Sequence, residues 1–429
     1  MLAVALGILL TLLLLSVPVA ATLIILALIL DWGFTRFPLY RGMGEVLWSA
    51  SDSFLLIAIP MFILLGEILV RAGIAARTYE ALDKWLSWMP GGLLHANIGT
   101  ATLFSATSGS SVATAATVGS VAMPQARKLG YDERLFAGSI AAGGTLGIMI
   151  PPSINLIVYG FLTETSIPQL FMAGLLPGLL LALLFMITAA IICLLRPGLD
   201  GPRRIASWRE RFRDLVHLLP VLGLFVVVVG SIYAGIATPT EAAALGVLVA
   251  ILLAAMNRRL SVTMMRDAIE GTLCTTAMIM LIIIAAYFLN YVLASVGLQR
   301  ELGNLIEMLG LSPYQTLLLI VLLYIVLGFF METLSLMVIT IPVVAPVVFI
   351  LGFDPVWFGI LLILLIEMAL ITPPVGLNLY VVQGVRGRGS LNEVMVGAAP
   401  FAAVMLVMVG VLIAWPDLAL YLPSLIASR

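Results

Sequence analysis

The chain has 429 residues, of which 62% are hydrophobic and only 10% are charged, with a net charge of −1 and a mean hydropathy of +1.19. Soluble domains carry about 25% charged residues, so this composition indicates a polytopic protein of the lipid bilayer and gives no support for nucleic-acid binding. Two cysteines and the lack of C-x-x-C, H-E-x-x-H and P-loop patterns leave a disulfide framework, a zinc site and an ATPase unsupported.

The first 30 residues form an apolar run without a basic leader. Because this run greatly exceeds the roughly 7–15 apolar residues of a secretory signal, we expect a retained membrane span over 3–30. A span needs about 20 apolar residues, and hydropathy predicts eight further crossings. They cover 49–70, 135–163, 168–195, 215–234, 240–256, 274–294, 356–384 and 398–421.

Two other apolar stretches, 93–123 and 314–350, are interrupted near their middle by small or polar residues. We interpret each as a re-entrant helical hairpin, because non-helical backbone at membrane depth is tolerated only inside protein or beside a wet cavity. With both hairpins re-entrant, 15 of the 21 Lys and Arg residues fall on one side of the bilayer. The positive-inside rule makes that side cytoplasmic, which predicts an N-terminus inside the cell and a C-terminus outside. The basic segments are 71–84, 127–134, 196–213 and 258–266.

A repeat relates the two halves of the sequence at an offset of 222 residues. Pro151-Pro152 matches Pro373-Pro374, and a slip of one residue aligns Asn155 with Asn378. Each copy holds an odd number of crossings, so the second copy is expected to be upside down relative to the first. Inverted repeats with paired broken helices are characteristic of secondary transporters.

The repeat divides the chain into four predicted regions. Amphipathic stretches at 77–89 and 299–309 follow the first crossing of each repeat and suit helices lying in the membrane interface, although ordinary loop helices are the alternative. The four regions are an N-terminal span (1–45), a first inverted repeat (46–195), a cytoplasmic linker with two connecting spans (196–267) and a second inverted repeat (268–429).

The turn of the first hairpin, FSATSGSSVATAATVGS (104–120), is rich in hydroxyl groups around Gly109. Hydroxyl and carbonyl oxygens are suitable ligands for a hard cation, and hydroxyls also donate hydrogen bonds to a carboxylate. Helix packing is the alternative, because small residues, Ser and Thr are common where membrane helices meet.

The broken crossings contain GTLGIMIPPSIN (144–155) and EMALITPPVGLN (367–378). Proline lacks an N–H group and releases carbonyls from the helical ladder. A half-helix that ends at the break directs partial negative charge at a cation, and the half-helix that follows directs N–H groups at an anion. We therefore expect each break to contribute to a site for sodium and a carboxylate, the alternative being a simple proline kink.

Three acidic residues, Glu67, Glu332 and Glu367, are expected at membrane depth. A carboxylate there is costly and is a functional candidate, although each acid could instead be satisfied structurally. No Lys or Arg lies between Arg134 and Arg196, or between Arg300 and Arg386. The charge of an anionic solute would therefore be met by helix N-termini and bound cations.

The motifs GEILVRAGI, SATSGSSVATAATVGSVAMP, GIMIPPS, GIATPTEAAA and ITPPVGLNLYVV resemble the large membrane subunit of the tripartite ATP-independent periplasmic (TRAP) transporters. The resemblance covers nearly the whole chain. It implies an all-α polytopic membrane protein with an inverted-repeat, elevator-type ion-transporter fold, two re-entrant hairpins and two broken helices. It also implies a bacterial inner-membrane location, Na⁺ as the coupling ion, a separate small four-helix membrane subunit, and a periplasmic binding protein that delivers an organic acid.

Carried onto this sequence, the resemblance also implies site residues. Glu332 departs from the aspartate expected after the second hairpin's Gly-Phe. The first sodium site would use Ser105 and Ser108 with Gly147, Ile150 and Pro152, and the second would use Gly328, Ala369, Thr372 and Val375. The solute would bind near Ser110, Ser111, Thr114, Asn155, Thr333 and Asn378.

The leading functional hypothesis is sodium-coupled uptake of a small organic acid, such as a C4-dicarboxylate or a sugar acid like sialic acid. A stand-alone sodium/dicarboxylate symporter of related fold is an alternative that needs no partner subunits. An intramembrane enzyme is a remote alternative, because the three acids lie on different elements and lack histidine or cysteine nearby in the sequence. We therefore expect a transporter and no enzymatic activity.

Overall fold

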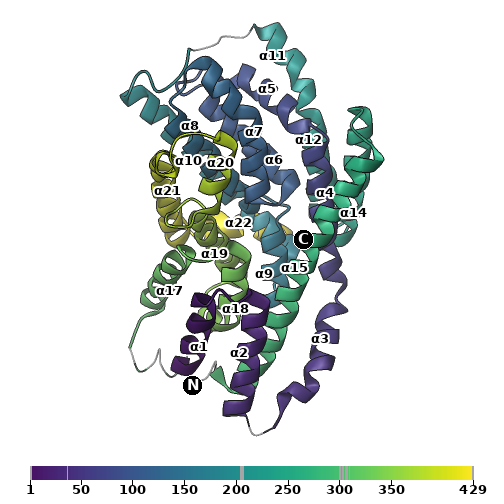
Figure 1. The fold of residues 1–429 in the computed structure, drawn as a ribbon, viewed down its shortest axis with the longest axis vertical. Coiled ribbons are helices and arrows are strands. Elements are labelled where there is room, and N and C mark those ends of the chain that lie inside the picture. Colours follow the sequence, from purple (N-terminus) through teal and green to yellow (C-terminus); the bar gives the residue numbers. More distant parts are fainter. Residues whose placement is uncertain are drawn as a thin grey trace.

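The computed structural model describes residues 2–35, 37–202, 207–298, 301, 304, 308 and 310–427, and within them every regular element is a helix. Figure 1 shows an elongated molecule in which most helices run along the long axis. Six described helices are long and apolar enough to cross a membrane, or up to eight if each bent pair is one span. The all-α polytopic class predicted from the sequence is confirmed.

The N-terminal apolar run forms two helices, and not the single crossing predicted over 3–30. α1 (Leu2–Leu14) and α2 (Val19–Phe34) pack against each other across a turn in which Ser16 has a φ of 56°. Pro18 ends the run of helical backbone, because proline disfavours helical geometry at the preceding residue. As a result, α1 begins at the lower end of the molecule in Figure 1.

Three helices form a long wall beside the hairpins and the broken helices. α4 (Ala58–Arg71) packs against α14 (Pro239–Met256) and against α15 (Val262–Ser295), which extends well beyond the predicted crossing at 274–294. The amphipathic stretch 77–89 overlaps α5 (Ile74–Leu86), whereas 299–309 lies largely outside the described residues. The other helices between the repeats and before α4 are α3 (Met43–Ser51), α11 (Trp208–Asp214), α12 (Leu219–Phe225) and α13 (Ser231–Tyr233).

The first repeat contains a helical hairpin and a broken helix. The chain turns at Gly109 between the two hairpin helices, and the halves of the broken helix are bent by 41° at the Pro151-Pro152 break. Asp132 starts the broken helix by accepting the N–H groups of Arg134 and Leu135, at 3.1 and 2.9 Å. The elements are α6 (Leu93–Ser108), α7 (Ser111–Leu129), α8 (Glu133–Met149), α9 (Ile154–Thr163) and α10 (Ile167–Leu195).

The second repeat reproduces this order of elements. Asp354, which is 222 residues after Asp132, accepts the N–H groups of Val356 and Trp357 at 2.8 and 3.0 Å. The repeat seen in the sequence therefore extends to the caps that start equivalent helices. The elements are α17 (Pro313–Gly328), α18 (Thr333–Ile350), α19 (Pro355–Ala369), α20 (Leu377–Arg386), α21 (Leu391–Ala414) and α22 (Asp417–Ala427).

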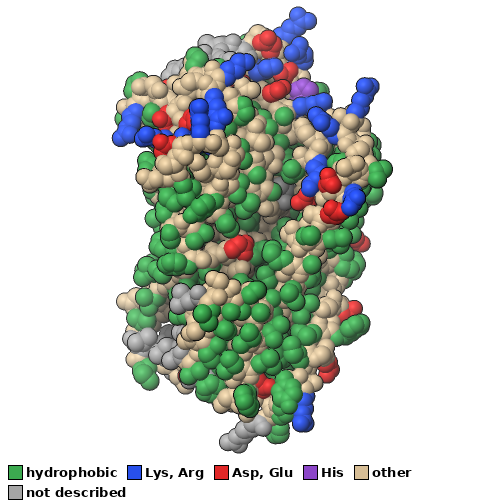
Figure 2. All heavy atoms as spheres, in the orientation of Figure 1, with side chains coloured by type: hydrophobic (Ala, Val, Ile, Leu, Met, Phe, Trp, Pro, Cys, Tyr) green, Lys and Arg blue, Asp and Glu red, His purple; other side chains and the backbone are tan. Residues whose placement is uncertain are grey.

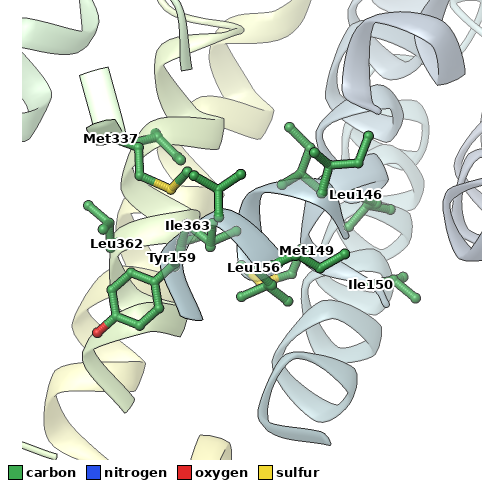
Figure 3. Close-up of a cluster of buried hydrophobic side chains, with 14 of the residues drawn as sticks. Leu146, Met149, Ile150, Leu156, Tyr159, Met337, Leu362 and Ile363 are labelled. Atoms are coloured by element: carbon green, nitrogen blue, oxygen red, sulfur yellow. The ribbon is translucent and has the colours of Figure 1, made fainter. Parts of the chain in front are cut away.

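The two repeats point in opposite directions. In Figure 1, α6 and α7 occupy the upper half of the molecule, while α17 and α18 occupy the lower half. The broken helices meet in a buried hydrophobic cluster, in which Leu146 and Met149 of α8 lie near Leu362 and Ile363 of α19 (Figure 3). Close packing of these halves brings both breaks towards the middle of the molecule.

Basic side chains mark one end of the molecule. Figure 2 shows most visible Lys and Arg side chains at the upper end, above flanks covered by hydrophobic side chains. At this end Arg386 of α20 forms ion pairs with Glu133 of α8 at 3.0 Å and with Glu393 of α21 at 2.6 Å. The basic segments of the sequence therefore gather on one side, as the positive-inside argument requires.

Candidate functional site

A cavity of about 160 Å³ lies where the two repeats meet. Both hairpin tips and both broken helices border it, and α4 and α15 form its remaining wall. The convergence of the breaks predicted from the sequence is therefore present in the structure. The lining residues from the repeats include Ser110 and Ser111 of the first tip, Ile154 and Asn155 of α9, Glu332 and Thr333 of the second tip, and Leu370 and Leu377 of the second break.

The tip of the first hairpin packs directly on the first break. Gly109 has a φ of +60°, and a Cβ added there would lie 3.1 Å from the carbonyl oxygen of Pro152. A Cβ added to Gly147 would lie 2.8 Å from the carbonyl oxygen of Ser110. Only glycine permits backbone to approach this closely at both positions, so the tip and the broken helix are in direct contact.

The second hairpin makes an equivalent approach to the second break. A Cβ added to Gly328 would lie 2.6 Å from the Cβ of Ala369. Just beyond this contact, the carboxylate of Glu332 accepts the N–H groups of Leu334 and Ser335, each at 3.1 Å. Glu332 therefore caps α18, which is the structural alternative considered for this acid.

Each break leaves a carbonyl without its usual helical donor. In an α-helix the N–H of residue i bonds to the carbonyl of residue i−4, and proline has no N–H. Pro151 therefore cannot serve the Gly147 carbonyl, and Pro373 cannot serve the Ala369 carbonyl. Both carbonyls belong to residues that contact a hairpin tip, so each junction offers a backbone oxygen of the kind that hard cations prefer.

The residues predicted for the first sodium site surround the first junction. The Ser105 hydroxyl donates to the carbonyl of Leu146, directly before Gly147. Ile150 and Pro152 are buried in the break, and the side chain of Ser108 lies outside the described residues. The structure thus brings Ser105 next to the end of α8.

The residues predicted for the second sodium site surround the second junction. Gly328 and Ala369 are in contact, as described above. The Thr372 hydroxyl donates to the carbonyl of Met368 at 3.0 Å, and Val375 lies half-buried within the break. The hydroxyl oxygen of Thr372 keeps lone pairs with which it could also bind a cation.

Four of the six residues predicted to bind the solute line the cavity: Ser110, Ser111, Asn155 and Thr333. Thr114 is buried but is not among the lining residues. Asn378 lies away from the cavity because its amide donates to the carbonyl of Ala141 at 3.2 Å and so links α20 to α8. The match between Asn155 and Asn378 in the sequence therefore does not place both side chains at the cavity.

The most consequential contact was not predictable from the sequence. Glu367 of α19 is fully buried, and the Ser111 hydroxyl lies 2.9 Å from each of its two carboxylate oxygens. The residues are 256 positions apart and belong to different repeats. A buried acid was recognised in the sequence, but no pattern indicated its partner.

Among the residues described at the cavity, the two charged ones, Glu67 and Glu332, both have partners, and those of Glu332 are the N–H groups described above. Glu67 of α4 forms an ion pair with Arg71, one turn along the same helix. No Lys or Arg side chain is found among the described residues that line the cavity. A bound anion would therefore have to be held by N–H groups, hydroxyls and Asn155, whose buried amide nitrogen has no hydrogen-bond partner in the described part of the chain.

Comparison with known proteins agrees with this architecture. The model of the family described as the tripartite ATP-independent periplasmic transporter, DctM component, matches residues 6–418. The chain belongs to this family. It is 36% identical over 387 residues to the C4-dicarboxylate TRAP transporter large permease protein DctM of Pseudomonas aeruginosa, covering 90% of each chain. It is 33% identical over 383 residues to the sialic acid TRAP transporter large permease protein SiaM of Vibrio cholerae, covering 89% of each chain.

The fold of this DctM-family chain is also similar to that of a solved transporter. The YdaH transporter of Alcanivorax borkumensis superposes with a TM-score of 0.65 at 14% sequence identity, covering 95% of this chain and 99% of that one. At this identity the likeness concerns the fold alone. The family resemblance drawn from the motifs is confirmed, and relatives named as permeases indicate a transporter rather than an enzyme.

Proposed function

We propose that this chain is the large membrane subunit of a sodium-coupled importer of small organic acids, working with a small four-helix membrane subunit and a periplasmic binding protein. The observation that carries the proposal is the single cavity at which both hairpin tips and both breaks meet. C4-dicarboxylates and sugar acids remain the leading solute classes, because relatives named for both are similar along most of the chain.

Sodium would bind at the two junctions between a hairpin and a break. Each junction combines a carbonyl that its proline leaves without a donor with a nearby hydroxyl, from Ser105 or Thr372. These oxygen donors fit a hard monovalent cation. The bound ions would add positive charge next to a cavity that has no Lys or Arg lining it among the described residues.

The acidic group of the solute would be met by helix N-termini together with polar side chains. α9 and α20 both begin at a break, and their residues Ile154, Asn155 and Leu377 line the cavity. N–H groups at a helix N-terminus carry partial positive charge. The neutral amide of Asn155 could donate to a carboxylate oxygen of the solute.

Transport would follow an elevator movement of the hairpins and broken helices relative to α4 and α15. The cavity lies between these two groups of helices, so sliding one group past the other would carry the solute with its lining. We place the basic end in the cytoplasm of a bacterial inner membrane. The start of α1 lies towards the opposite end (Figure 1), so on this proposal the N-terminus is periplasmic, whereas the sequence predicted a cytoplasmic one.

The test is uptake into liposomes that contain both membrane subunits, with the binding protein added outside. Candidate acids are first chosen by their thermal stabilisation of the purified binding protein. We expect solute to accumulate only with an inward sodium gradient and with the binding protein present. Accumulation without a sodium gradient would contradict sodium coupling, and accumulation without the binding protein would favour the stand-alone symporter.

A further inference from the structure

The contact between Ser111 and Glu367 joins the two repeats next to the cavity. Ser111 is the first residue of α7 and lines the cavity, whereas Glu367 lies in the last turn of α19 with no exposed surface. Both carboxylate oxygens are 2.9 Å from the Ser111 hydroxyl. A hydroxyl has one proton to donate. The carbonyl oxygen of Thr145 is a more distant acceptor at 3.4 Å, so the two carboxylate oxygens are the nearest partners of this proton.

The position of Glu367 suits a carboxylate better than an apolar side chain. A polar group buried at this depth is costly unless it is hydrogen-bonded. Here the Ser111 hydroxyl, at the N-terminus of α7, supplies that hydrogen bond. The contact therefore stabilises the start of α7 with a side chain supplied by the other repeat.

The same contact lies between the proposed second sodium site and the cavity proposed to bind the solute. Glu367 is two residues before Ala369, whose carbonyl belongs to the proposed second sodium site. Ser111 follows Ser110, and both form the first hairpin's wall of the cavity. The contact thus links the end of α19 directly to the tip of the first hairpin.

We propose that Glu367 is a positioning residue that holds the tip of the first hairpin on the second broken helix, and so couples sodium binding at the second junction to the shape of the solute cavity. The coupling rests on the proposed function, whereas the contact itself does not. A buried acid that served stability alone would not need to be shared between a hairpin tip and the opposite repeat.

The experiment compares the wild-type complex of the two membrane subunits with Glu367→Gln, Glu367→Ala, Ser111→Ala, Ser111→Thr and Ser111→Ala/Glu367→Ala. The first readout is the sodium concentration that half-saturates thermal stabilisation in detergent, measured with NaCl against choline chloride. The second is the split between KM and maximal rate for solute uptake in liposomes. Thr340→Val is the matched control, because it removes another buried hydroxyl, bonded to Tyr324 at 2.5 Å, far along the second hairpin from its tip.

We expect Glu367→Ala and Ser111→Ala each to raise the sodium half-saturation and the solute KM about tenfold, the size expected when a buried hydrogen-bond partner is left unsatisfied. The double variant should be no worse than either single variant, because both remove the same contact. Glu367→Gln and Ser111→Thr keep an acceptor or a hydroxyl and should stay within about threefold of wild type. Thr340→Val should lower the unfolding temperature without moving the sodium half-saturation.

Two outcomes would overturn the inference. In the first, Ser111→Ala and Glu367→Ala lower thermal stability as Thr340→Val does but leave sodium half-saturation and KM unchanged. In the second, their effects on sodium half-saturation are additive. Failure of the proposed function is distinguishable, because the wild-type complex itself would then show no stabilisation by sodium. In that case, hydrogen exchange at residues 109–115 is compared between wild type and Glu367→Ala, and exchange that is no faster in the variant would show that the contact does not hold the tip.

Discussion

The two hairpin tips solve the same physical problem in different ways. Each tip presents the N-terminus of a helix to the cavity, and the first N–H groups of a helix have no partner within it. At the second tip, Glu332 accepts two of these N–H groups from its own helix. At the first tip, the Ser110 hydroxyl accepts the N–H of Ala113 at 3.4 Å, and the hydroxyl of Ser111 donates to the carboxylate of Glu367 from the opposite repeat.

The two repeats therefore share an architecture, but among the described residues only the first hairpin tip is hydrogen-bonded to a side chain from the opposite repeat. The second tip is stabilised locally, so a change at Glu332 should act mainly on α18. The first tip has a neutral cap of its own and is also joined to a residue 256 positions away, so a change in either repeat reaches it. The contact between Asn378 and Ala141 adds a second link between the repeats, from α20 to α8.

The largest expected effect comes from filling the glycine contact at the first tip. Gly147→Ala would place a methyl group 2.8 Å from the backbone oxygen of Ser110, and overpacking of this kind costs about 1–3 kcal/mol. Because the obstructing atoms are backbone, the tip itself has to move. We expect sodium-driven uptake to fall by at least about tenfold, measured in liposomes with both membrane subunits.

The second tip supplies the control for this prediction. Gly328→Ala meets the side-chain methyl of Ala369 at 2.6 Å, so the paired change Ala369→Gly removes the obstruction. We expect Gly328→Ala to reduce uptake and Gly328→Ala/Ala369→Gly to recover most of it. If Gly147→Ala and the paired variant reduce uptake equally, the obstruction at the second junction is not confined to the side chain of Ala369.

A smaller effect is expected from removing the carboxylate at the second tip. Glu332→Ala deletes the acceptor of two backbone N–H groups, and loss of an N-cap costs about 0.5–2 kcal/mol. Glu332→Asp should keep most of the cap, because aspartate is a preferred N-cap residue. The measurement is the thermal unfolding of the purified complex, with and without sodium.

For Glu332 the response to sodium separates local from shared stabilisation. If the cap acts only on α18, Glu332→Ala lowers the unfolding temperature equally at all sodium concentrations. A change in the sodium half-saturation as large as that of Glu367→Ala would mean that the second tip is coupled across the repeats as well.

The features that could be predicted from the sequence are those with a local chemical signature. The Pro-Pro breaks, the small and hydroxyl residues of the first turn, and the basic segments each act within a few residues, and all were recognisable. The turn between α1 and α2 also had a local signal, Ser16-Val17-Pro18, but it was outweighed by the surrounding apolar residues.

The remaining features depend on three-dimensional proximity. The partner of Glu367 is set by how α19 packs against α8, which itself packs against α7, and neither residue's neighbours in the sequence indicate the other. In the same way, Asn378 has the sequence position expected of a cavity residue, yet its amide is committed to Ala141. A one-residue slip in the repeat near Asn378 places equivalent side chains in different surroundings.

The smallest expected effect concerns the start of the first broken helix's second half, where the cap is neutral. The Ser153 hydroxyl accepts the N–H of Leu156 at 3.3 Å, whereas the carboxylate of Glu332 caps the helix at the second hairpin tip. Hydrogen bonds to ionised groups are roughly twice as strong as neutral ones, so Ser153→Ala should cost about 1 kcal/mol or less and less than Glu332→Ala. Ser207→Ala is the matched control, because its exposed hydroxyl caps α11 at the same 3.3 Å from the N–H of Glu210. If Ser153→Ala lowers the unfolding temperature more than Glu332→Ala does, the ranking of charged above neutral caps at this site is wrong, and the start of α9 is held more firmly than either hairpin tip.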